Sequence, residues 1–381
     1  MAKTPIVWIS AVETSADMHG ARVMQRLRER HPGIRFQGVG GAAMRAAGLE
    51  AVARAEDLSV MGITEVLEVL PRILGILHRV KKTIRSTRPQ VVLCIDAPDF
   101  HFPVTKFAAR QGIPVVYYVA PQAWAWRQGR VRFLRRYVHR LLCLLPFEEA
   151  FFRNHGVNAH FTGHPLLEEM AEHSAGIQTP EPNTLALLPG SRRKEIQALL
   201  PVFRQTAHQL HQHHPSLRCR LIQAPGIGAE ELTAQWPSDL PLELVPATER
   251  WPALGGATVA LAASGTATLE CALLGVPTVV AYTVSPLSYA VGKHLVRVPY
   301  MSLPNLILNT PLFPELLQKQ VRPERMLPQL DAWLCAPEQR EAIRGQLEGL
   351  RSKLGTSTAS LEVARAVEEA AGLERAAAPR M

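Results

Sequence analysis

The chain has 381 residues, of which 47% are hydrophobic and 20% charged, and its formal net charge at pH 7 is +9. This length allows about two domains with well-buried cores, and the composition is that of a globular rather than a disordered protein. The basic balance favours anionic partners such as a phosphorylated substrate, an acidic lipid surface or nucleic acid, although a solvated basic face has the same composition.

Cysteine usage and hydropathy bear on the compartment. No CxxC motif occurs and most cysteines lie in apolar runs, so we expect buried free thiols in a reducing environment, at Cys94, Cys143, Cys219, Cys271 and Cys335. No signal peptide is visible, and glycine or proline interrupts the uncharged stretches 251–269 and 271–292. We therefore expect no membrane span.

Short apolar runs alternate with amphipathic stretches through the first part of the chain. A helix is predicted at 20–30, and strands at 6–10, 35–39, 91–95, 115–119 and 140–145. The wholly apolar run 91–95 is typical of a strand buried on both faces of a parallel sheet. This alternation predicts βαβ units.

The polar, proline-containing stretch 171–183 predicts a linker, after which the alternation restarts. A helix is predicted at 194–212, and strands at 185–188, 219–223, 242–245, 258–261 and 278–281. The fold class is therefore α/β, with two doubly wound, Rossmann-like domains facing a cleft. We place them at 1–170 and 184–340, followed by a C-terminal helical tail at 341–381 that packs back towards the first domain.

Two Gly/Ser turns, Gly190-Ser191-Arg192 and Ser264-Gly265-Thr266, each follow a predicted strand and open a predicted helix. Such turns direct unpaired backbone N–H groups and the positive end of a helix dipole at one spot, which suits a diphosphate. Arg192 would add a forked cation, and Glu270 could accept hydrogen bonds from sugar hydroxyls. The alternative is that these are ordinary turns, since many α/β helices begin this way without a ligand.

Acidic side chains follow the predicted strands of the first domain. Asp96 and Asp99 come after the buried run 91–95, where a carboxylate in a partly apolar cleft would suit a general base. Pro98 restricts the turn between them. The alternative for each is a turn or helix cap, which is the commoner role of an aspartate at a strand end.

Three further polar candidates follow the first strand, and a fourth lies in the second domain. Glu13, Ser15 and Asp17 occupy the first βα turn, which often handles a ligand, but Ser15 or Asp17 could equally cap a helix. Asn305 follows a proline-fixed turn and either contacts phosphate or sugar or caps the next helix. No histidine has a partner at metal-ligand spacing, so no metal and no other cofactor is expected.

Residues 62–82 form an apolar band wider than a single core-facing stripe requires, and basic residues follow it. This pattern indicates an interfacial membrane contact, although a helix buried on both sides gives the same pattern. The side chains expected to face the membrane are Val66, Leu67, Val69, Leu70, Ile73, Leu74, Ile76 and Leu77.

Together the motifs resemble those of the lipid-A-disaccharide synthase family, glycosyltransferase family 19. The resemblance covers residues 6–317 and is carried, in order, by Met61-Gly62-Ile63 with Glu65-Val66-Leu67, Ile95-Asp96-Ala97-Pro98-Asp99-Phe100, Trp124-Ala125-Trp126-Arg127, Leu145-Pro146-Phe147-Glu148, Gly163-His164-Pro165, Leu188-Pro189-Gly190-Ser191-Arg192 with Glu195-Ile196, Ser264-Gly265-Thr266-Ala267-Thr268-Leu269-Glu270 and Ser302-Leu303-Pro304-Asn305-Leu306. So many motifs in one order are far more specific than any single turn.

The resemblance implies an inverting glycosyltransferase of the GT-B fold that works at the cytoplasmic face of the inner membrane of a Gram-negative bacterium. Its donor would be UDP-2,3-diacylglucosamine and its acceptor 2,3-diacylglucosamine 1-phosphate. The products would be UDP and the disaccharide 1-phosphate of lipid A. The first domain would face acceptor and membrane, and the second would bind the UDP-sugar. The resemblance leaves a homodimer open, and no nucleic acid is implied.

The resemblance also gives the candidate residues roles. Asp99 would be the base, with Asp96 and Glu13 as further catalytic candidates, and Ser15 and Asp17 would line the acceptor side. The donor would contact Gly190, Ser191, Arg192, Ser264, Gly265, Thr266, Glu270 and Asn305.

The chain departs from the family pattern in a few places. Val12 and Ala16 replace two glycines of the first loop, His101 stands where asparagine is usual, and Glu168 where aspartate is usual. Two alternatives remain open: a UDP-sugar epimerase on the same scaffold, and a non-catalytic relative that binds UDP or lipid.

Overall fold

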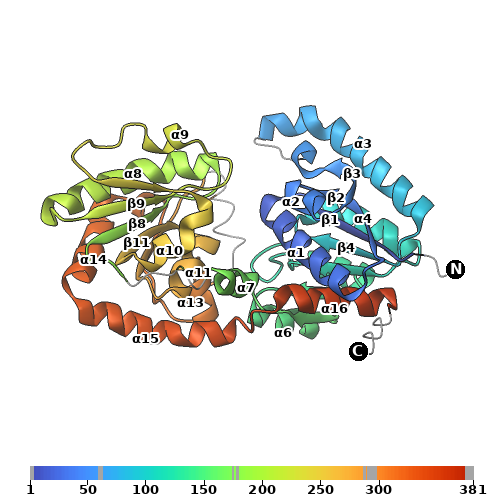
Figure 1. Ribbon diagram of the computed structural model, residues 1–381. Helices are drawn as coiled ribbons and strands as arrows, with labels where there is room; N and C mark the ends of the chain where they lie inside the picture. The colour runs from blue at the N-terminus through green and yellow to red at the C-terminus, as the bar shows by residue number, and fades with distance from the viewer. Residues whose placement is uncertain are drawn as a thin grey trace, which may run out of the picture. The chain divides into compact units, whose positions relative to one another are not determined.

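The computed structural model describes residues 4–58, 63–173, 176, 180–285, 289 and 298–373, and for residues 63–69 it describes the backbone alone. The chain divides into two compact units (Figure 1). Unit 1 comprises Met1–Pro165 and Gly355–Met381, and unit 2 comprises Leu166–Leu354. Each unit is a parallel sheet with helices on both faces, as the sequence predicts.

The sheet of unit 1 has the strand order β3-β2-β1-β4-β5-β6-β7. Its strands are β1 (Ile6–Ala11), β2 (Arg35–Gly40), β3 (Glu50–Arg54), β4 (Val91–Ile95), β5 (Val115–Tyr118), β6 (Arg140–Cys143) and β7 (Ala159–Phe161). The central strands β1, β4 and β5 are buried along their whole length, which explains their continuous apolar runs.

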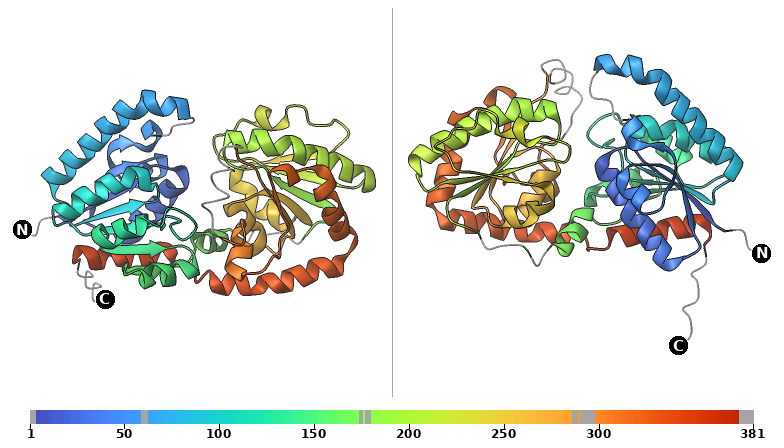
Figure 2. Two further views of the ribbon diagram at one scale, coloured as in Figure 1. Left: turned by 180° about the vertical axis from the view of Figure 1, so that it is seen from behind. Right: turned by 45° about the horizontal axis from the view of Figure 1, so that its top comes forward.

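Helices cover both faces of this sheet, and Figure 2 shows α3 running along one of them. They are α1 (Thr14–Arg30), α2 (Ala42–Ala46), α3 (Ile63–Thr87), α4 (Pro98–Arg110), α5 (Arg130–Tyr137), α6 (Pro146–Asn154) and α16 (Ala359–Ala371). Alternate residues of β1 face the two layers. Trp8 packs in the core under α3, α4 and α5, whereas Val7 and Ile9 pack in the core under α1, α2 and α16.

The sheet of unit 2 has the strand order β10-β9-β8-β11-β12-β13. Its strands are β8 (Thr184–Leu188), β9 (Arg218–Ile222), β10 (Leu242–Val245), β11 (Val259–Ala263), β12 (Thr278–Tyr282) and β13 (Glu315–Leu317). Its helices include α7 (Pro165–Glu172), α8 (Arg193–His213), α9 (Ala229–Thr233), α10 (Arg250–Gly255), α11 (Thr266–Leu273), α13 (Leu303–Leu308), α14 (Pro323–Cys335) and α15 (Pro337–Lys353).

Both sheets reverse their strand order at one place. In unit 1 the order turns between β1 and β4, and in unit 2 between β8 and β11. This is the strand order of the Rossmann fold, in which ligands bind beyond the carboxyl ends of the two strands at the reversal.

Some predicted features differ from the structure. Unit 2 begins at Leu166, whereas the sequence predicts a linker at 171–183 between the domains. Helix α7 (Pro165–Glu172) precedes this predicted linker and includes its first two residues. The short strands β3, β7 and β13 at or near the sheet edges carry too little periodicity for sequence prediction. Four cysteines are buried as expected, but Cys335 is exposed. Among the residues that the structure describes, none of the helices combines the length and hydropathy of a membrane span.

The helical tail expected at 341–381 is shared between the units. Helix α15 packs against α11, α13 and α14 of unit 2, whereas α16 packs against α1 of unit 1. Glu368 of α16 fixes the second contact. Its carboxylate accepts hydrogen bonds from the guanidinium of Arg30, at 2.6 and 2.9 Å, and lies 3.0 Å from Nε2 of His31. This ion pair is largely buried.

Replacing Glu368 by alanine should therefore destabilise unit 1. The change leaves the Arg30 guanidinium without its carboxylate in a site where water cannot fully solvate it, which costs about 3 kcal/mol. We expect urea denaturation to show a loss of this size. Glu369→Ala is the matched control, because Glu369 pairs with Arg140 but is 62% exposed. Such a pair contributes about 1 kcal/mol at most, so equal losses in the two variants would contradict the prediction.

Candidate functional site

The candidate residues lie at the two reversals of strand order. In unit 1, Ala11 pairs with Ile95 at the carboxyl ends of β1 and β4, so the turns 12–17 and 96–99 are neighbours. In unit 2, Leu188 pairs with Ala262 near the ends of β8 and β11, so the turns 190–192 and 264–266 are neighbours. Within each unit the structure thus brings together motifs that are 70 or more residues apart in the sequence.

The turn after β4 has an unusual backbone. Asp96 and Ala97 both adopt the left-handed conformation, with φ of 55° and 43°, which costs non-glycine residues about 1–2 kcal/mol each. Hydrogen bonds to the Asp96 carbonyl oxygen hold the turn, because the His101 ring nitrogen Nδ1 and the Tyr117 hydroxyl each lie 2.7 Å from it. His101 Nε2 lies 2.8 Å from the hydroxyl oxygen of Ser10.

This network fixes the state of His101. The Asp96 carbonyl can only accept, so Nδ1 carries the proton and Nε2 accepts from Ser10. Burial lowers the pKa of His101 to about 4, which keeps the ring neutral at neutral pH. The histidine that replaces the usual asparagine thus braces the turn that leads into α4.

Asp99 lies in the first turn of α4, and its side chain is 84% exposed. Its Oδ1 accepts a hydrogen bond of 2.7 Å from Arg130 and lies 3.6 Å from a guanidinium nitrogen of Arg127. The partly apolar surroundings expected from the sequence are absent among the described residues. Asp99 is instead an open carboxylate beside two cations.

Two further family motifs meet beside this turn. Trp124 donates a hydrogen bond of 2.8 Å to Glu148, whose other carboxylate oxygen accepts from the backbone N–H groups of Leu144 and Leu145. Burial raises the pKa of Glu148 to about 7. Glu148 therefore caps α6 and fixes the loop that contains Trp124.

The same loop carries Trp126, and cations stack on it. The guanidinium carbons of Arg127 and Arg130 lie 4.4 and 5.6 Å from the Trp126 ring centroid. These contacts, together with the ion pairs above, hold both arginines beside Asp99.

The first βα turn of unit 1 has an ordinary backbone. Glu13 and Ser15 are exposed at the start of α1, and no residue from 12 to 17 has a positive φ. Val12 and Ala16 are therefore compatible with the loop, and the replacement of glycine causes no strain there.

Asp17 has a structural role, which corrects the acceptor contact predicted for it. It is buried, and its carboxylate accepts hydrogen bonds from the backbone N–H groups of Gly41, Ala43 and Met44 at 2.7, 2.8 and 3.2 Å. These bonds cap α2 and tie it to α1. The close fit at Gly41, where a Cβ atom would lie 2.5 Å from Asp17 Oδ2, leaves no space for a ligand between them.

In unit 2, the turn after β8 is a basic helix start. Gly190 has φ 118°, and a Cβ atom there would lie 2.7 Å from Glu195, so glycine is required. Ser191 and Arg192 are exposed. Glu195 accepts from the backbone N–H of Ser191 at 3.3 Å and from Arg192 at 3.1 Å, so both donors have an acidic partner within the turn.

The turn after β11 opens α11 beside this site. Gly265 has φ 154°, and Gly265 and Thr266 are exposed at the first turn of the helix. Ser264 is fixed by its hydroxyl, which donates to the Met301 carbonyl at 2.9 Å. The half-buried Tyr282 ends β12 nearby, where burial and the Glu195 carboxylate raise its pKa.

Glu270 belongs to a buried cluster of charges. Its Oε1 accepts a hydrogen bond of 3.2 Å from Arg250, which also pairs with Glu169 of α7. Burial raises the pKa of Glu270, and the Arg250 cation opposes that shift. The second oxygen, Oε2, makes no hydrogen bond with the described residues and remains available to a ligand hydroxyl.

Asn305 is a structural residue, which corrects the phosphate or sugar contact predicted for it. The residue is fully buried. Its Nδ2 donates to the Phe313 carbonyl and to Glu315, and its Oδ1 accepts from the Phe313 N–H, each at 2.8 Å. Glu315 also accepts from the N–H groups of Met301 and Ser302. The motif at 302–306 therefore positions the Met301 carbonyl that binds Ser264.

The apolar band of α3 is only partly exposed. Leu70 and Leu74 are 43% and 56% exposed, and Ile73 is half-buried. Ile76 and Leu77 are buried in the core of unit 1, so the prediction that they face a membrane is wrong. The side chains of Val66, Leu67 and Val69 lie outside the described residues.

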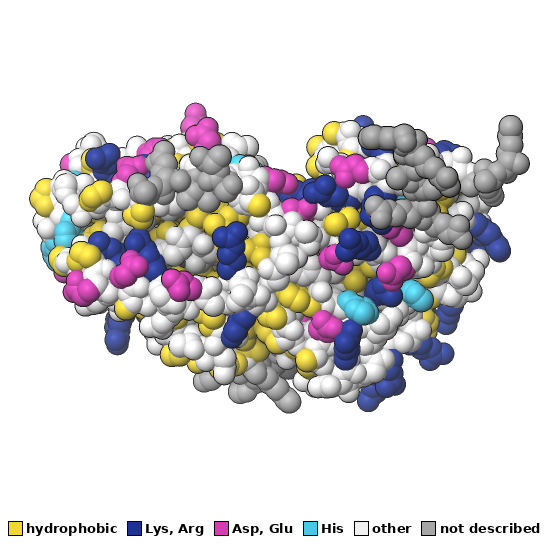
Figure 3. Space-filling model, turned by 60° about the horizontal axis from the view of Figure 1, so that its bottom comes forward, with side chains coloured by type: hydrophobic (Ala, Val, Ile, Leu, Met, Phe, Trp, Pro, Cys, Tyr) yellow, Lys and Arg dark blue, Asp and Glu magenta, His cyan; other side chains and the backbone are white. Residues whose placement is uncertain are grey.

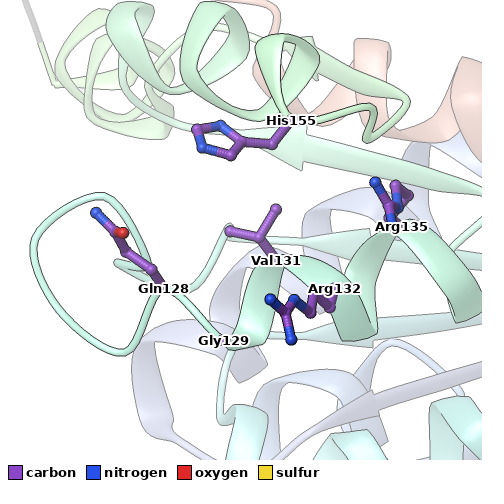
Figure 4. A pocket seen from close by; sticks show the side chains of 6 residues that line it. All are labelled: Gln128, Gly129, Val131, Arg132, Arg135 and His155. Atoms are coloured by element: carbon purple, nitrogen blue, oxygen red, sulfur yellow. The ribbon is translucent and has the colours of Figure 1, made fainter.

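A surface hollow lies over α5, away from the predicted site residues. It is lined by Gln128, Gly129, Val131, Arg132, Arg135 and His155 (Figure 4). Neither Arg132 nor Arg135 pairs with an acidic group among the described residues. On the face of the molecule that Figure 3 shows, basic and acidic side chains are interspersed. Two arginines among its lining residues favour an anion over a cation at this hollow.

Sequence reasoning missed the residues that act on the site from other strands. Arg130 and Tyr282 belong to none of the sequence motifs above, and Glu195 enters only within a family motif. The available signal was topological, because Arg130 follows β5, which lies next to β4, and Tyr282 ends β12, which lies next to β11.

Comparisons with known proteins agree with this architecture. Residues 7–365 match the profile of a family described as lipid-A-disaccharide synthetase. The chain is 41% identical over 380 residues to a lipid-A-disaccharide synthase of Anaeromyxobacter dehalogenans strain 2CP-1, covering 98% of each chain. It is 40% identical over 363 residues to that of Syntrophus aciditrophicus, covering 92% of this chain and 94% of the relative.

Solved structures share the fold at low identity. The calicheamicin glycosyltransferase CalG4 matches with a TM-score of 0.63 and 16% identity, covering 98% of this chain and 99% of that one. UDP-GlcNAc 2-epimerase from Neisseria meningitidis matches with a TM-score of 0.64 and 12% identity, covering 96% and 99%. The chain has the GT-B fold, and it belongs to the lipid-A-disaccharide synthase family of glycosyltransferases.

Proposed function

We propose that this protein transfers a diacylglucosamine unit from UDP-2,3-diacylglucosamine to the 6-hydroxyl of 2,3-diacylglucosamine 1-phosphate, with inversion at the anomeric carbon. The products are UDP and the disaccharide 1-phosphate of lipid A. Membership of the lipid-A-disaccharide synthase family carries the proposal. A basic, glycine-containing turn in unit 2 and an open carboxylate in unit 1 each supply a group that this reaction needs.

Unit 2 binds the donor in this proposal. Arg192, Ser191 and the exposed start of α11 at Gly265 and Thr266 hold the diphosphate, and Glu270 Oε2 accepts from a ribose hydroxyl. As the bond from the anomeric carbon to the β-phosphate oxygen breaks, negative charge grows on UDP. The guanidinium and the helix N-termini stabilise that charge. These groups supply the positive charge that a metal would otherwise bring, so we propose transfer without a catalytic metal.

Unit 1 supplies the base in this proposal. The Asp99 carboxylate takes the proton from the acceptor 6-hydroxyl as its oxygen attacks the anomeric carbon from the face opposite UDP. Asp99 is exposed and can reach an incoming hydroxyl, whereas the His101 network holds the backbone of Asp96. Arg130 and Arg127 fix the carboxylate in one direction. Asp96 and Glu13 stay further catalytic candidates, and Ser15 stays a candidate for contact with the acceptor.

An epimerase shares the scaffold but is not favoured, because the structural likeness to these epimerases is at 11–12% identity and extends to the fold alone. A non-catalytic relative is motivated only by the altered first loop. The altered loop is weak evidence for a loss of activity, because Val12 and Ala16 cause no backbone strain.

Acceptor-dependent release of UDP tests the proposal. The purified protein should release UDP from the diacyl donor only when the acylated glucosamine 1-phosphate is present, and Asp99→Asn should lower turnover by roughly 10²–10⁴-fold without weakening UDP binding. Both are measured by a coupled UDP assay and by calorimetric titration with UDP.

Glu50→Gln is the control, because Glu50 is another exposed acid of unit 1 that is paired with an arginine. It should keep full turnover. Donor consumption without acceptor would support an epimerase instead, and an active Asp99→Asn variant would remove Asp99 from the base role.

The brace at His101 gives a pH dependence of stability. The folded ring stays neutral down to a pKa of about 4, whereas the unfolded imidazole binds a proton below about pH 6.5. Between these values the unfolded state binds more protons, so the free energy of unfolding falls as the pH falls. We expect His101 to contribute about 3 kcal/mol to this loss.

His101→Asn has no titrating ring and can still donate to the Asp96 carbonyl. Urea unfolding at pH 7 and pH 4 should show a smaller loss in this variant. Parallel pH profiles for the variant and the unchanged protein would contradict the proposed burial of a neutral ring.

Association with the cytoplasmic face of the inner membrane follows from the acylated substrates. We propose that Leu70 and Leu74 on α3 enter the lipid, while the arginines of the α5 hollow contact anionic headgroups. Both helices lie in the same layer over the sheet of unit 1.

The double change Leu70→Ser and Leu74→Ser should weaken binding to phosphatidylglycerol-containing vesicles about tenfold or more, because each exposed leucine loses its transfer energy. Vesicle sedimentation measures the binding. Met18→Ser is the control, because Met18 is 42% exposed on α1, which covers the opposite face of the sheet. Equal binding by the two variants would exclude Leu70 and Leu74 from the membrane contact.

A further inference from the structure

Three potential metal ligands meet in unit 2, at the contact between α8 and α14. His214 is the residue that ends α8, and Asp331 and Cys335 lie on α14. One ligand atom from each residue lies within 4.8 Å of the other two. Asp331 and Cys335 are four residues apart, which places them on one face of their helix, and His214 approaches that face from the packed partner helix.

Contacts within the cluster orient its ligands. His214 Nε2 lies 2.6 Å from Asp331 Oδ1, and Nδ1 of the neighbouring His213 lies 3.7 Å from the same oxygen. The side chain of His214 is 17% exposed, Asp331 is 41% exposed, and Cys335 is exposed. The cluster is thus open to solvent on the cysteine side, where an ion can enter.

The donor set is selective. An imidazole nitrogen, a thiolate and a carboxylate together suit Zn²⁺, whereas Mg²⁺ and Ca²⁺ prefer oxygen ligands alone. Bond lengths of about 2.0–2.3 Å place tetrahedral ligand atoms roughly 3.3–3.8 Å apart. His214 Nε2 and Asp331 Oδ1 are 2.6 Å apart and must separate by about 0.7 Å, whereas a ligand atom at the 4.8 Å limit must approach by about 1 Å. Rotation of the Asp331 and Cys335 side chains can supply both changes.

We propose that His214, Asp331 and Cys335 form a zinc site that clips the end of α8 to α14, with water or His213 as the fourth ligand. The site is separate from the residues of the proposed transfer reaction, and its role is to stabilise unit 2. The spacing of ligands along the sequence gives no sign of this site. His214 and Asp331 are 117 residues apart, and only the packing of the two helices brings them together.

Titration of the metal-free, full-length protein tests the site. One Zn²⁺ should bind per chain and raise the melting temperature, since an ion that binds the folded state alone stabilises it. Co²⁺ at the same site should give the ultraviolet charge-transfer band of a thiolate ligand. Cys335→Ser should abolish that band and weaken Zn²⁺ binding roughly 100-fold, judged from the loss of one of three protein ligands.

Thiol labelling gives an independent readout. Cys335 is exposed and the other four cysteines are buried, so a thiol reagent should label one site on the native protein, and Zn²⁺ should slow that labelling. His208→Ala is the control, because His208 pairs with Asp239 elsewhere on unit 2 without a cysteine. It should bind Zn²⁺ like the unchanged protein. The proposal is overturned if the protein binds no Zn²⁺ or if Zn²⁺ does not slow the labelling of Cys335. It is also overturned if Zn²⁺ binding survives the double change Cys335→Ser and Asp331→Asn.

Discussion

The reversal of strand order in each sheet is the constraint on which the rest of the structure depends. Because all strands run parallel, their carboxyl ends share one edge, and the connections leave in opposite directions on the two sides of the reversal. The helices that start there direct their first N–H groups towards this edge. In unit 1 this place holds the turns around Asp99, and in unit 2 it holds those around Arg192. The chemistry of the two units differs because the side chains differ, not because the backbone does.

Much of the fold could be predicted from the sequence, because it depends on local patterns. Fully buried strands such as β4 and β11 require continuous apolar residues, and the helices between them require amphipathic ones. The edge strand β3 is partly exposed and has no such requirement, so it left no clear signal. The sequence pattern likewise gave no sign that the C-terminal tail is divided between the two units. This division rests on the apolar face of α16 and on the contacts of Glu368 with Arg30 and His31, more than 330 residues away.

The site was only partly predictable, because a motif marks a position and not a role. Asp17 and Asn305 have the residue types of ligand contacts, yet every bond described for them goes to the protein's own backbone or to Glu315. Their motifs hold turns in shape, as the Glu148 cap does beside Trp124. Gly190 and Asp99 belong to equally specific motifs. Asp99 is open to solvent, and Gly190 lies in a turn whose next two residues are exposed. Burial separates the two groups, and the sequence does not report burial at turns.

The open residues share one electrostatic feature. Asp99 pairs with Arg130, and Arg192 pairs with Glu195, so each candidate reactive charge faces an opposite charge in the free protein. Exposed pairs of this kind contribute at most about 1 kcal/mol, so a ligand can replace one partner at small cost. A diphosphate offers Arg192 more charge and a bidentate geometry that Glu195 cannot match. Glu195 orders the turn, and in the proposed function the donor diphosphate takes its place at Arg192.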